Sequence, residues 1–290
     1  MPRVAFVIPA YNAVATVAAA VRSACEQVVP ADEVIVVDDG SVDDTAAVAE
    51  RAGARVLVRA NGGPGAARNT GIQATTAEWI ALLDADDVAR PDRLQIEHNY
   101  LDDTRTAVVH AARTVPARYT ADPPPVLDFA ALWARNRICT STVLLRRAAW
   151  ESAGGFDEAR ALIGVEDYNL WLRLAHARWR FIWLARVLVD YLPVESSLSA
   201  QYERIANAEL HNAKRVGAQL HLPPDMLRQK EYALYRDYGV ELFHRGERRV
   251  ARDFFREAAR RGRLDWPARL RLWAATLTVP PLRRSVSAGQ

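Results

Sequence analysis

The sequence is poor in cysteine, because its 290 residues contain only Cys25 and Cys139. Their spacing fits neither a metal clip nor a disulfide framework. Secreted domains more often depend on disulfide crosslinks, so two cysteines favour a reducing compartment. We therefore expect a cytoplasmic protein.

Long apolar runs are also absent. No uninterrupted apolar stretch approaches the roughly 20 residues that a transmembrane helix needs. The start, Met1-Pro2-Arg3, leads directly into a short apolar segment and lacks the hydrophobic length and cleavage site of a signal peptide. These absences predict a protein that is soluble or attached peripherally, at most at the cytoplasmic face of a membrane.

Lysine is scarce, since only Lys214 and Lys230 occur among 38 basic residues. A formal net charge of +3 is too small to indicate a nucleic-acid binder, so no such partner is expected. From Arg245 onward, however, twelve basic residues stand against four acidic ones, which leaves the rest of the chain acidic. The mixture of arginines and apolar residues between Arg269 and Arg284 predicts either peripheral contact with an anionic membrane or an amphipathic helix packed on the body.

The first part of the chain alternates apolar runs with helical periodicity. Continuous aliphatic runs predict strands buried on both faces at residues 4–9, 34–38, 55–59 and 79–84. Helices are predicted between them at residues 16–25 and 44–53, and another near Pro91. This alternation predicts an α/β fold with a mostly parallel central sheet flanked by helices.

The second part begins at the rigid break Asp122-Pro123-Pro124-Pro125. A helix is predicted at residues 127–136, a strand near 142–145 and a helix at 165–178. From residue 200 onward the pattern is almost wholly helical. We predict an α/β domain over residues 1–198 and a helical C-terminal region over residues 199–290.

A first acidic cluster, Asp38-Asp39-Gly40-Ser41, ends the second predicted strand. Ligands of open α/β sheets bind outside the carboxyl ends of the strands. Two carboxylates there can accept hydrogen bonds from ribose hydroxyls and from a pyrimidine N–H. A turn that caps the next helix explains the same residues equally well, so both interpretations stay open.

A second cluster, Asp84-Ala85-Asp86-Asp87, follows the fourth predicted strand. Strand alternation directs Asp84 and Asp86 to the same side. Hard divalent cations bind oxygen ligands, typically one or two carboxylates together with substrate phosphates. An acidic triplet exceeds what a solvated turn needs, so the cluster predicts a metal site.

A glycine-rich stretch, residues 61–71, lies between these clusters. Pro64 and the small residues after it predict a helix whose N-terminus faces an anion, and Arg68 adds a positive charge. The spacing matches neither a Walker A loop nor a dinucleotide fingerprint. Taken alone, the stretch is better explained as a glycine-rich turn.

A third cluster, Glu166-Asp167, begins the predicted helix at residues 165–178. Asp167 shares one helix face with Leu170, Trp171 and Leu174. The helix dipole explains Glu166 well, but it does not explain a carboxylate at the end of an apolar stripe. Asp167 is therefore a candidate general base.

Taken in chain order, these motifs resemble the family-2 glycosyltransferases, which are inverting enzymes of the GT-A fold. The resemblance rests on VAFVIPAYN at residues 4–12, DDGS at 38–41, GAARNTG at 65–71, LDADD at 83–87, GGFDE at 154–158, and Glu166-Asp167 with Trp171 and Arg173. It covers roughly residues 3 to 190. The resemblance implies transfer of a sugar from a nucleoside-diphosphate sugar, often a UDP-sugar, to a hydroxyl acceptor.

The resemblance also implies which residues bind the donor. The nucleoside would be held by Pro9, Tyr11, Asp38 and Asp39, with Arg68 nearby. Asp84 and Asp86 would form an Asp-x-Asp element, and Asp86 is the expected direct ligand of Mn²⁺ or Mg²⁺.

On the acceptor side, Asp167 would deprotonate the attacking hydroxyl, so that a single displacement inverts the anomeric carbon. Gly155, Phe156, Glu166 and Trp171 would shape this side of the site. The expected acceptor is a carbohydrate or a lipid-linked sugar, in polysaccharide or glycolipid assembly.

The chain departs from the family pattern at residues 191–197, which lack the Arg and His that many members carry there. It also lacks the Gln-x-x-Arg-Trp element of the processive branch, so we expect one sugar per encounter.

Two alternatives remain. A sugar-phosphate nucleotidyltransferase usually has a glycine-rich loop after the first strand, where this chain has Pro9-Ala10-Tyr11-Asn12. A non-catalytic sugar-nucleotide-binding protein would not need Asp84, Asp86 and Asp167.

Overall fold

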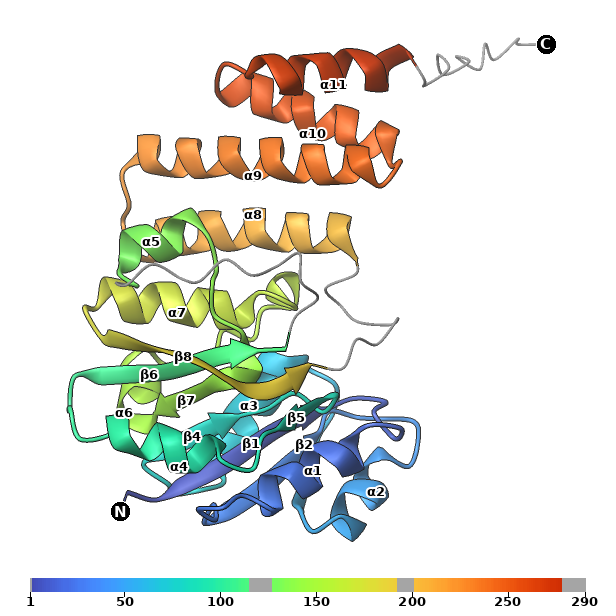
Figure 1. Ribbon diagram of the computed structural model, residues 1–290. Coiled ribbons are helices and arrows are strands. Elements are labelled where there is room, and N and C mark those ends of the chain that lie inside the picture. The colour runs from blue at the N-terminus through green and yellow to red at the C-terminus, as the bar shows by residue number, and fades with distance from the viewer. Residues whose placement is uncertain (1, 115–126, 192–200, 278–290) are drawn as a thin grey trace. The chain divides into compact units, whose positions relative to one another are not determined.

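The computed structural model describes residues 2–114, 127–191 and 201–277 (Figure 1). The chain divides into two compact units, Met1–Ser197 and Leu198–Gln290. Three predicted features lie outside the described residues: the proline break at 122–125, nearly all of the segment 191–197, and Arg283-Arg284.

The first unit is built on one mixed sheet of eight strands, in the order β3-β2-β1-β4-β7-β6-β8-β5. The strands are β1 (Val4–Ala10), β2 (Glu33–Asp38), β3 (Arg55–Val58), β4 (Trp79–Leu82), β5 (Asp87–Ala89), β6 (Thr106–Arg113), β7 (Val143–Arg146) and β8 (Arg180–Tyr191). β3, β2, β1 and β4 are parallel, as are β6 and β8. β7 runs antiparallel to β4 and β6, and β5 runs antiparallel to β8.

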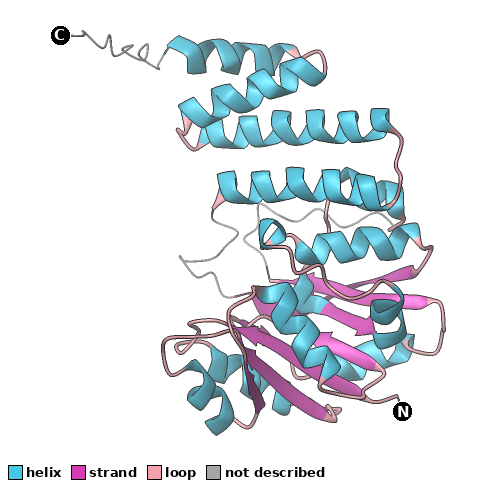
Figure 2. Cartoon of the chain, turned by 180° about the vertical axis from the view of Figure 1, so that it is seen from behind, coloured by secondary structure: helices cyan, strands magenta, loops and turns pink. Residues whose placement is uncertain are grey.

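Helices cover both faces of this sheet (Figure 2). They are α1 (Val17–Cys25), α2 (Thr45–Arg51), α3 (Pro64–Gln73), α4 (Arg93–Glu97), α6 (Arg147–Ser152) and α7 (Glu166–His176), whereas α5 (Phe129–Ala134) packs on α7. Alternation along β1 sends Phe6 and Ile8 into a core shared with α1, α2 and α4. Val7 points to the opposite face, where α3 packs. The α/β class with a helix-flanked, mostly parallel sheet is confirmed.

The second unit is helical. It consists of α8 (Tyr202–Gln219), α9 (Pro224–His244), α10 (Arg248–Arg261) and α11 (Trp266–Leu277), and each helix packs on the next one along the chain. Pro224 stands in the first turn of α9, where its missing N–H costs nothing. Within the described ranges, no helix combines the length and the apolarity that a membrane crossing requires.

Sequence patterns missed three strands, β5, β6 and β8. Pairing between β6 and β8 contains three register irregularities, which disturb the alternation expected of a strand. Asp87, which belongs to the predicted metal cluster, begins β5, and β5 pairs with the end of β8. The helix near Pro91 is α4, only five residues long.

Candidate active site

Parallel pairing brings the ends of β1, β2 and β4 to one edge of the sheet. Ala10 is in register with Asp38, and Val7 with Leu82. Tyr11, just beyond β1, is 53% exposed at this edge, and Pro9 is partly buried. The predicted nucleoside-binding residues therefore gather where open α/β sheets bind their ligands.

Asp38 and Asp39 are both buried and hold the loops at this edge. The Asp39 carboxylate accepts hydrogen bonds from the N–H groups of Gly62 and Gly63, at 3.0 and 2.7 Å, and pairs with Arg59 at 2.8 Å. Asp38 accepts hydrogen bonds from the N–H and hydroxyl of Ser41. The next helix, α2, begins after Asp44 without a side-chain cap, so Asp38 and Asp39 act by shaping the loops that line this edge.

Of the two explanations of the glycine-rich stretch, a plain turn or a helix that begins at Pro64, the structure shows the helix, α3. Gly63 has φ of +91°, a conformation that favours glycine, and Pro64 follows at the first helical position. A Cβ at Gly65 would lie 3.1 Å from Cγ of Glu166. The starts of α3 and α7 therefore approach closely.

Arg68 connects the second and third acidic clusters. Its buried guanidinium donates from Nη2 to Oδ1 of Asp84 at 2.7 Å and from Nη1 to Oε1 of Glu166 at 2.6 Å. Burial opposes the charge, but Asp84 and Glu166 outweigh it and raise the pKa of Arg68. Residues 84 and 166, far apart in the sequence, are held around one cation.

Asp167, the second residue of α7, lies beside the same cluster and contacts a short helical turn formed by Thr140–Thr142. Its carboxylate accepts hydrogen bonds from the Thr140 hydroxyl and from the N–H of Tyr168. The next residue on the turn, Ser141, accepts a hydrogen bond from the Asp84 N–H at 3.1 Å. Burial, followed by the negative charge of Glu166, raises the pKa of Asp167 to about 6.

Glu166, in the first turn of α7, was expected on the acceptor side of the site, and its position also suits the helix dipole. Its side chain is buried and ion-paired with Arg68. Asp167 is the more exposed of the two acids. The apolar stripe that continues from Asp167 is core, because Leu170, Trp171 and Leu174 are fully buried.

Among the predicted acceptor-side residues, the two aromatic ones are buried, whereas Gly155 lies in a loop. Phe156 and Trp171 are buried and meet edge to face, with ring centroids 6.3 Å apart. Gly155 belongs to the loop above them and has φ of +80°. The aromatic rings therefore support this loop by packing beneath it.

Asn69 and Arg173 fix the same loop, and sequence analysis gave neither a role. Asn69 Oδ1 accepts hydrogen bonds from Trp150 Nε1 and the Phe156 N–H, while Nδ2 donates to the Phe156 carbonyl and to Glu158. Arg173 donates to the carbonyls of Ala153 and Gly155. Both residues lie within the quoted motifs, which was the only sequence signal for them.

Arg93 is a third residue to which sequence analysis gave no role. It is wholly buried, pairs with Glu97, and donates to the carbonyls of Leu82, Ser141 and Val143 at 3.2, 2.8 and 3.0 Å. These carbonyls belong to the end of β4, to the turn that contacts Asp167, and to the start of β7. Arg93 therefore ties the segment before Asp84 to the segment that holds Asp167.

The donor set at Asp84 and Asp86 fits a divalent cation shared with a phosphate ligand. Burial is the main reason that the pKa of Asp86 is raised, and the negative charge of neighbouring Asp84 adds to the effect. The neighbouring buried atom Oδ1 of Asp87 has no hydrogen-bond partner in the described part of the chain. Within that part, no group of three or more His, Cys, Asp or Glu side chains is placed to hold a metal alone. Mg²⁺ typically needs only one or two carboxylates when phosphates complete its shell.

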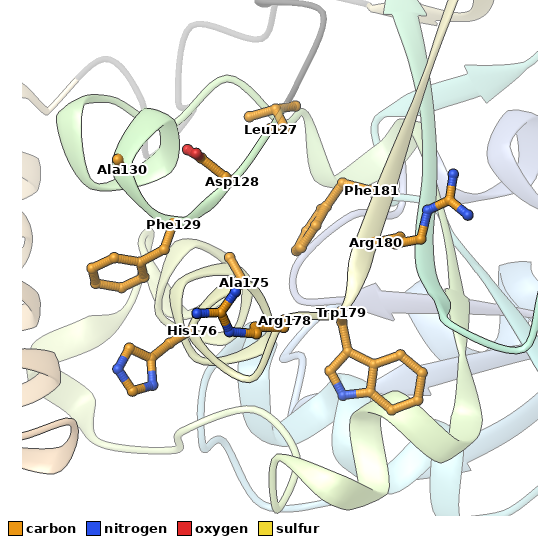
Figure 3. A pocket seen from close by; sticks show the side chains of 10 residues that line it. All are labelled: Leu127, Asp128, Phe129, Ala130, Ala175, His176, Arg178, Trp179, Arg180 and Phe181. Carbon is orange, nitrogen blue, oxygen red and sulfur yellow. The ribbon is translucent and has the colours of Figure 1, made fainter.

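A cavity of about 880 Å³ lies elsewhere in the first unit (Figure 3). It is lined by the start of α5, the end of α7 and the start of β8, including His176, Arg178 and Trp179. Asp167 stands at the opposite end of the 11-residue helix α7, about 15 Å away along its axis. We locate the candidate chemistry at the carboxylates, because this cavity lacks such a cluster among its lining residues.

The profile of the family "Glycosyl transferase family 2" matches residues 5–156, which is more than half of the chain. The chain belongs to glycosyl transferase family 2. The matched range contains Asp38, Asp39, Arg68, Asp84 and Asp86 and ends at Phe156.

Two relatives from Rhizobium meliloti are succinoglycan biosynthesis proteins. ExoO is 32% identical over 69% of this chain and 56% of its own length, and ExoU is 35% identical over 62% and 59%. Chondroitin synthase of Escherichia coli is 27% identical over 60% of this chain and 27% of its own length. The chain spans little more than half the length of ExoO and ExoU.

Solved glycosyltransferases share the fold. TarS of S. aureus, residues 1–349 with UDP-GlcNAc, superposes with a TM-score of 0.65 and 17% identity over 88% of this chain and 81% of that one. The mannosyltransferase PcManGT of Pyrobaculum calidifontis, with GDP-Man and Mn²⁺, superposes with a TM-score of 0.64 and 21% identity over 95% and 80%. These similarities confirm the predicted GT-A type of this family-2 chain.

Proposed function

We propose that this family-2 protein transfers a sugar from a nucleoside-diphosphate sugar to a hydroxyl group of a carbohydrate or lipid-linked acceptor, with inversion. The observation that carries this proposal is the position of Arg68 between Asp84 and Glu166. It brings the proposed metal-binding and base-bearing segments to one place.

On the donor side, Pro9, Tyr11, Asp38 and Asp39 would hold the nucleoside at the sheet edge, and UDP is the favoured diphosphate. Support comes from the TarS structure, which contains UDP-GlcNAc, whereas PcManGT contains GDP-Man. A donor panel must therefore include both bases.

Asp86, with Asp84 beside it, would hold the proposed divalent cation, Mn²⁺ or Mg²⁺. When bound, such an ion offsets the negative charge of the diphosphate. PcManGT is in complex with Mn²⁺, which supports the assignment by analogy of fold.

Asp167 would remove the proton from the acceptor hydroxyl. The Thr140 hydroxyl and the Tyr168 N–H orient its carboxylate, and the raised pKa makes it a stronger base while leaving it ionised at neutral pH. The acceptor oxygen then bonds to the anomeric carbon as the bond to the diphosphate breaks, and the electron pair leaves with the diphosphate. Attack from the opposite face inverts the configuration.

Polysaccharide or glycolipid assembly is the proposed setting. ExoO and ExoU are named for succinoglycan biosynthesis, and WfaP of Escherichia coli, 26% identical over 60% of this chain, is named a glucosyltransferase acting on a GlcNAc-diphosphoundecaprenol. The sugar and the linkage would be set by this chain's own acceptor side.

The test uses the full chain, a panel of UDP- and GDP-sugars, and nucleotide release with NMR of the product anomer. Asp167→Asn should reduce transfer by about 100-fold or more while nucleotide binding persists. The matched control is Asp102→Asn, an exposed carboxylate that should leave the rate unchanged. Wild-type rates for Asp167→Asn, or pyrophosphate release from a nucleoside triphosphate and a sugar phosphate, would contradict the proposal.

A further inference from the structure

The last described helix, α11, packs with its small residues inward and its large apolar residues outward. Ala268 and Ala275, seven positions apart on one face, are buried within the second unit. Trp266, Leu270 and Trp273 are 73%, 47% and 62% exposed. Ordinary surface helices bury their bulky apolar residues, so this arrangement is inverted.

The three exposed residues form one stripe. Their spacing of i, i+4 and i+7 places them within about 60° of arc on a helix of 3.6 residues per turn. The two alanines fall on the opposite side of the same helix. We call Trp266, Leu270 and Trp273 the outer stripe of α11. Large exposed apolar patches of this kind mark interaction surfaces.

The charged side chains around the outer stripe indicate what kind of partner it binds. Arg263 and Arg269 are exposed beside it, whereas Asp265 is the acid in the segment 262–277. On the preceding helix Arg256 and Arg260 are exposed as well, but they pair with Asp253 and Glu257, so the positive charge is carried by Arg263 and Arg269. Tryptophans combined with arginines on a short helix are typical of segments that lie in the interface of an anionic membrane.

From these observations we propose that α11 docks the protein onto an anionic lipid surface, with the outer stripe inserted among the lipid headgroups and Arg263 and Arg269 on the phosphates. This surface belongs to the second unit and is independent of the transfer reaction. Sequence analysis predicted either contact with an anionic membrane or a packed amphipathic helix for the arginine-rich C-terminal segment. The proposal combines both, because the helix packs on its own unit through alanines and presents its other face to lipid.

Vesicle flotation of the full chain tests the proposal. Wild-type protein should float with vesicles of equal parts phosphatidylglycerol and phosphatidylcholine, bind vesicles of phosphatidylcholine alone much more weakly, and lose binding as salt increases. Trp266→Ser combined with Trp273→Ser should weaken binding by about tenfold or more, because membrane affinity scales with the apolar area inserted. The melting temperature should stay near that of wild type, since both rings are largely exposed.

Two control variants separate the stripe from general surface effects. Tyr100→Ser removes a 40% exposed aromatic side chain from the first unit and should float like wild type. Arg269→Gln should weaken binding about fivefold, the expected effect of one arginine at an anionic surface. Arg228→Gln, an exposed arginine on α9, should have little effect.

Three results would overturn the proposal. One is wild-type protein that stays unbound in the presence of phosphatidylglycerol vesicles. Another is the double tryptophan variant floating as well as wild type. The third is a concentration-dependent dimer, seen by sedimentation equilibrium without lipid, that the double variant dissociates and that does not float. This result would assign the stripe to a second copy of the chain.

Discussion

At the scale of single residues, Arg68 places one guanidinium between two carboxylates of different burial. Glu166 is almost completely enclosed, whereas the Asp84 side chain is about one-third exposed. If the arginine is lost, water can solvate the negative charge of Asp84, but it has little access to the charge of Glu166. The second oxygen of Glu166 accepts one further hydrogen bond, from the Gly164 N–H at 2.7 Å.

We therefore predict that Arg68→Gln destabilises the protein by about 3–5 kcal/mol, because a buried carboxylate loses its charged partner. Urea unfolding at neutral pH measures the change. Arg55→Gln is the control, since Arg55 pairs with Glu33 while largely exposed and should cost at most about 1 kcal/mol. Equal effects of the two substitutions would contradict a stabilising role for the buried pair.

His110, on β6, gives a prediction about acid stability. Its ring is fully buried, lies 5.1 Å from the Trp183 ring, and has no hydrogen-bond partner for either nitrogen within the described residues. Burial lowers its pKa from 6.5 to about 3. Between these values the unfolded chain binds the proton and the folded chain does not, so stability falls as pH decreases through this window.

His110→Leu should remove this loss of folding stability at low pH. The variant should be close to wild type at pH 7 and gain relative stability at lower pH, by up to about 1.4 kcal/mol per pH unit. Denaturant unfolding across the window measures the difference, with His211→Leu, exposed on α8, as the control. A constant difference between His110→Leu and wild type across this range would show that the imidazole is already protonated in the fold.

Asp84, Asp86 and Asp167 could be nominated from sequence because each adjoins a strong strand or helix pattern. Asn69, Thr140 and Arg93 could not be assigned roles in the same way. Asn69 bonds to Phe156, 87 positions away, and Thr140 to Asp167, 27 positions away. Such contacts depend on tertiary packing, which leaves no periodic signal in one sequence.

At the scale of elements, α3 lies unusually close to the sheet because of Gly71. A Cβ there would lie 2.6 Å from Cγ1 of Val7 on β1 and 3.1 Å from Cγ2 of Val37 on β2. Helix propensity alone favours alanine over glycine inside a helix. The close approach opposes that preference, since both valines are buried in the sheet.

We predict that Gly71→Ala destabilises the protein by about 1–3 kcal/mol, the usual cost of overpacking a core. Gly217→Ala in α8 is the matched control, because its Cβ would meet Leu227 at 3.5 Å, an ordinary contact. That substitution should stabilise by up to about 1 kcal/mol. Thermal and urea unfolding of both variants would show opposite signs, and a stabilising Gly71→Ala would contradict the tight packing of α3.

Elements differ in how far sequence could predict them. β1, β2 and β4 follow from continuous apolar runs, because parallel strands inside a sheet are buried on both faces. β3 was also predicted to be buried on both faces, and this is wrong: it is an edge strand of the sheet, and Arg55 and Val58 are exposed. β8 alternates exposed and buried residues irregularly, with Leu184 buried, Ala185 and Arg186 exposed, and Leu188 and Val189 both buried. Its pairing with β6 contains bulges, so neither a strand period nor a helix period is clear.

At the scale of the whole molecule, the two units carry different features. All predicted site residues lie in the unit Met1–Ser197, and the outer stripe of α11 lies in Leu198–Gln290. The boundary near residue 198 was predicted from the switch of an alternating pattern to a wholly helical one. A ligand of the proposed active site should therefore stabilise the first unit, because a ligand stabilises the state that binds it.

Calorimetry of the full chain with UDP and Mn²⁺ examines this expectation. The two ligands together should raise the unfolding temperature more than either alone, by an amount equivalent to about 2.7 kcal/mol when the ligand is at a hundred times its Kd. Asp86→Ala should abolish the increment due to Mn²⁺ and keep the smaller one due to UDP, since Asp38 and Asp39 remain. Asp102→Ala, an exposed acid, should behave like wild type. If Asp86→Ala keeps the full Mn²⁺ increment, the cation binds elsewhere, and the acidic cluster that follows β4 is not the metal site.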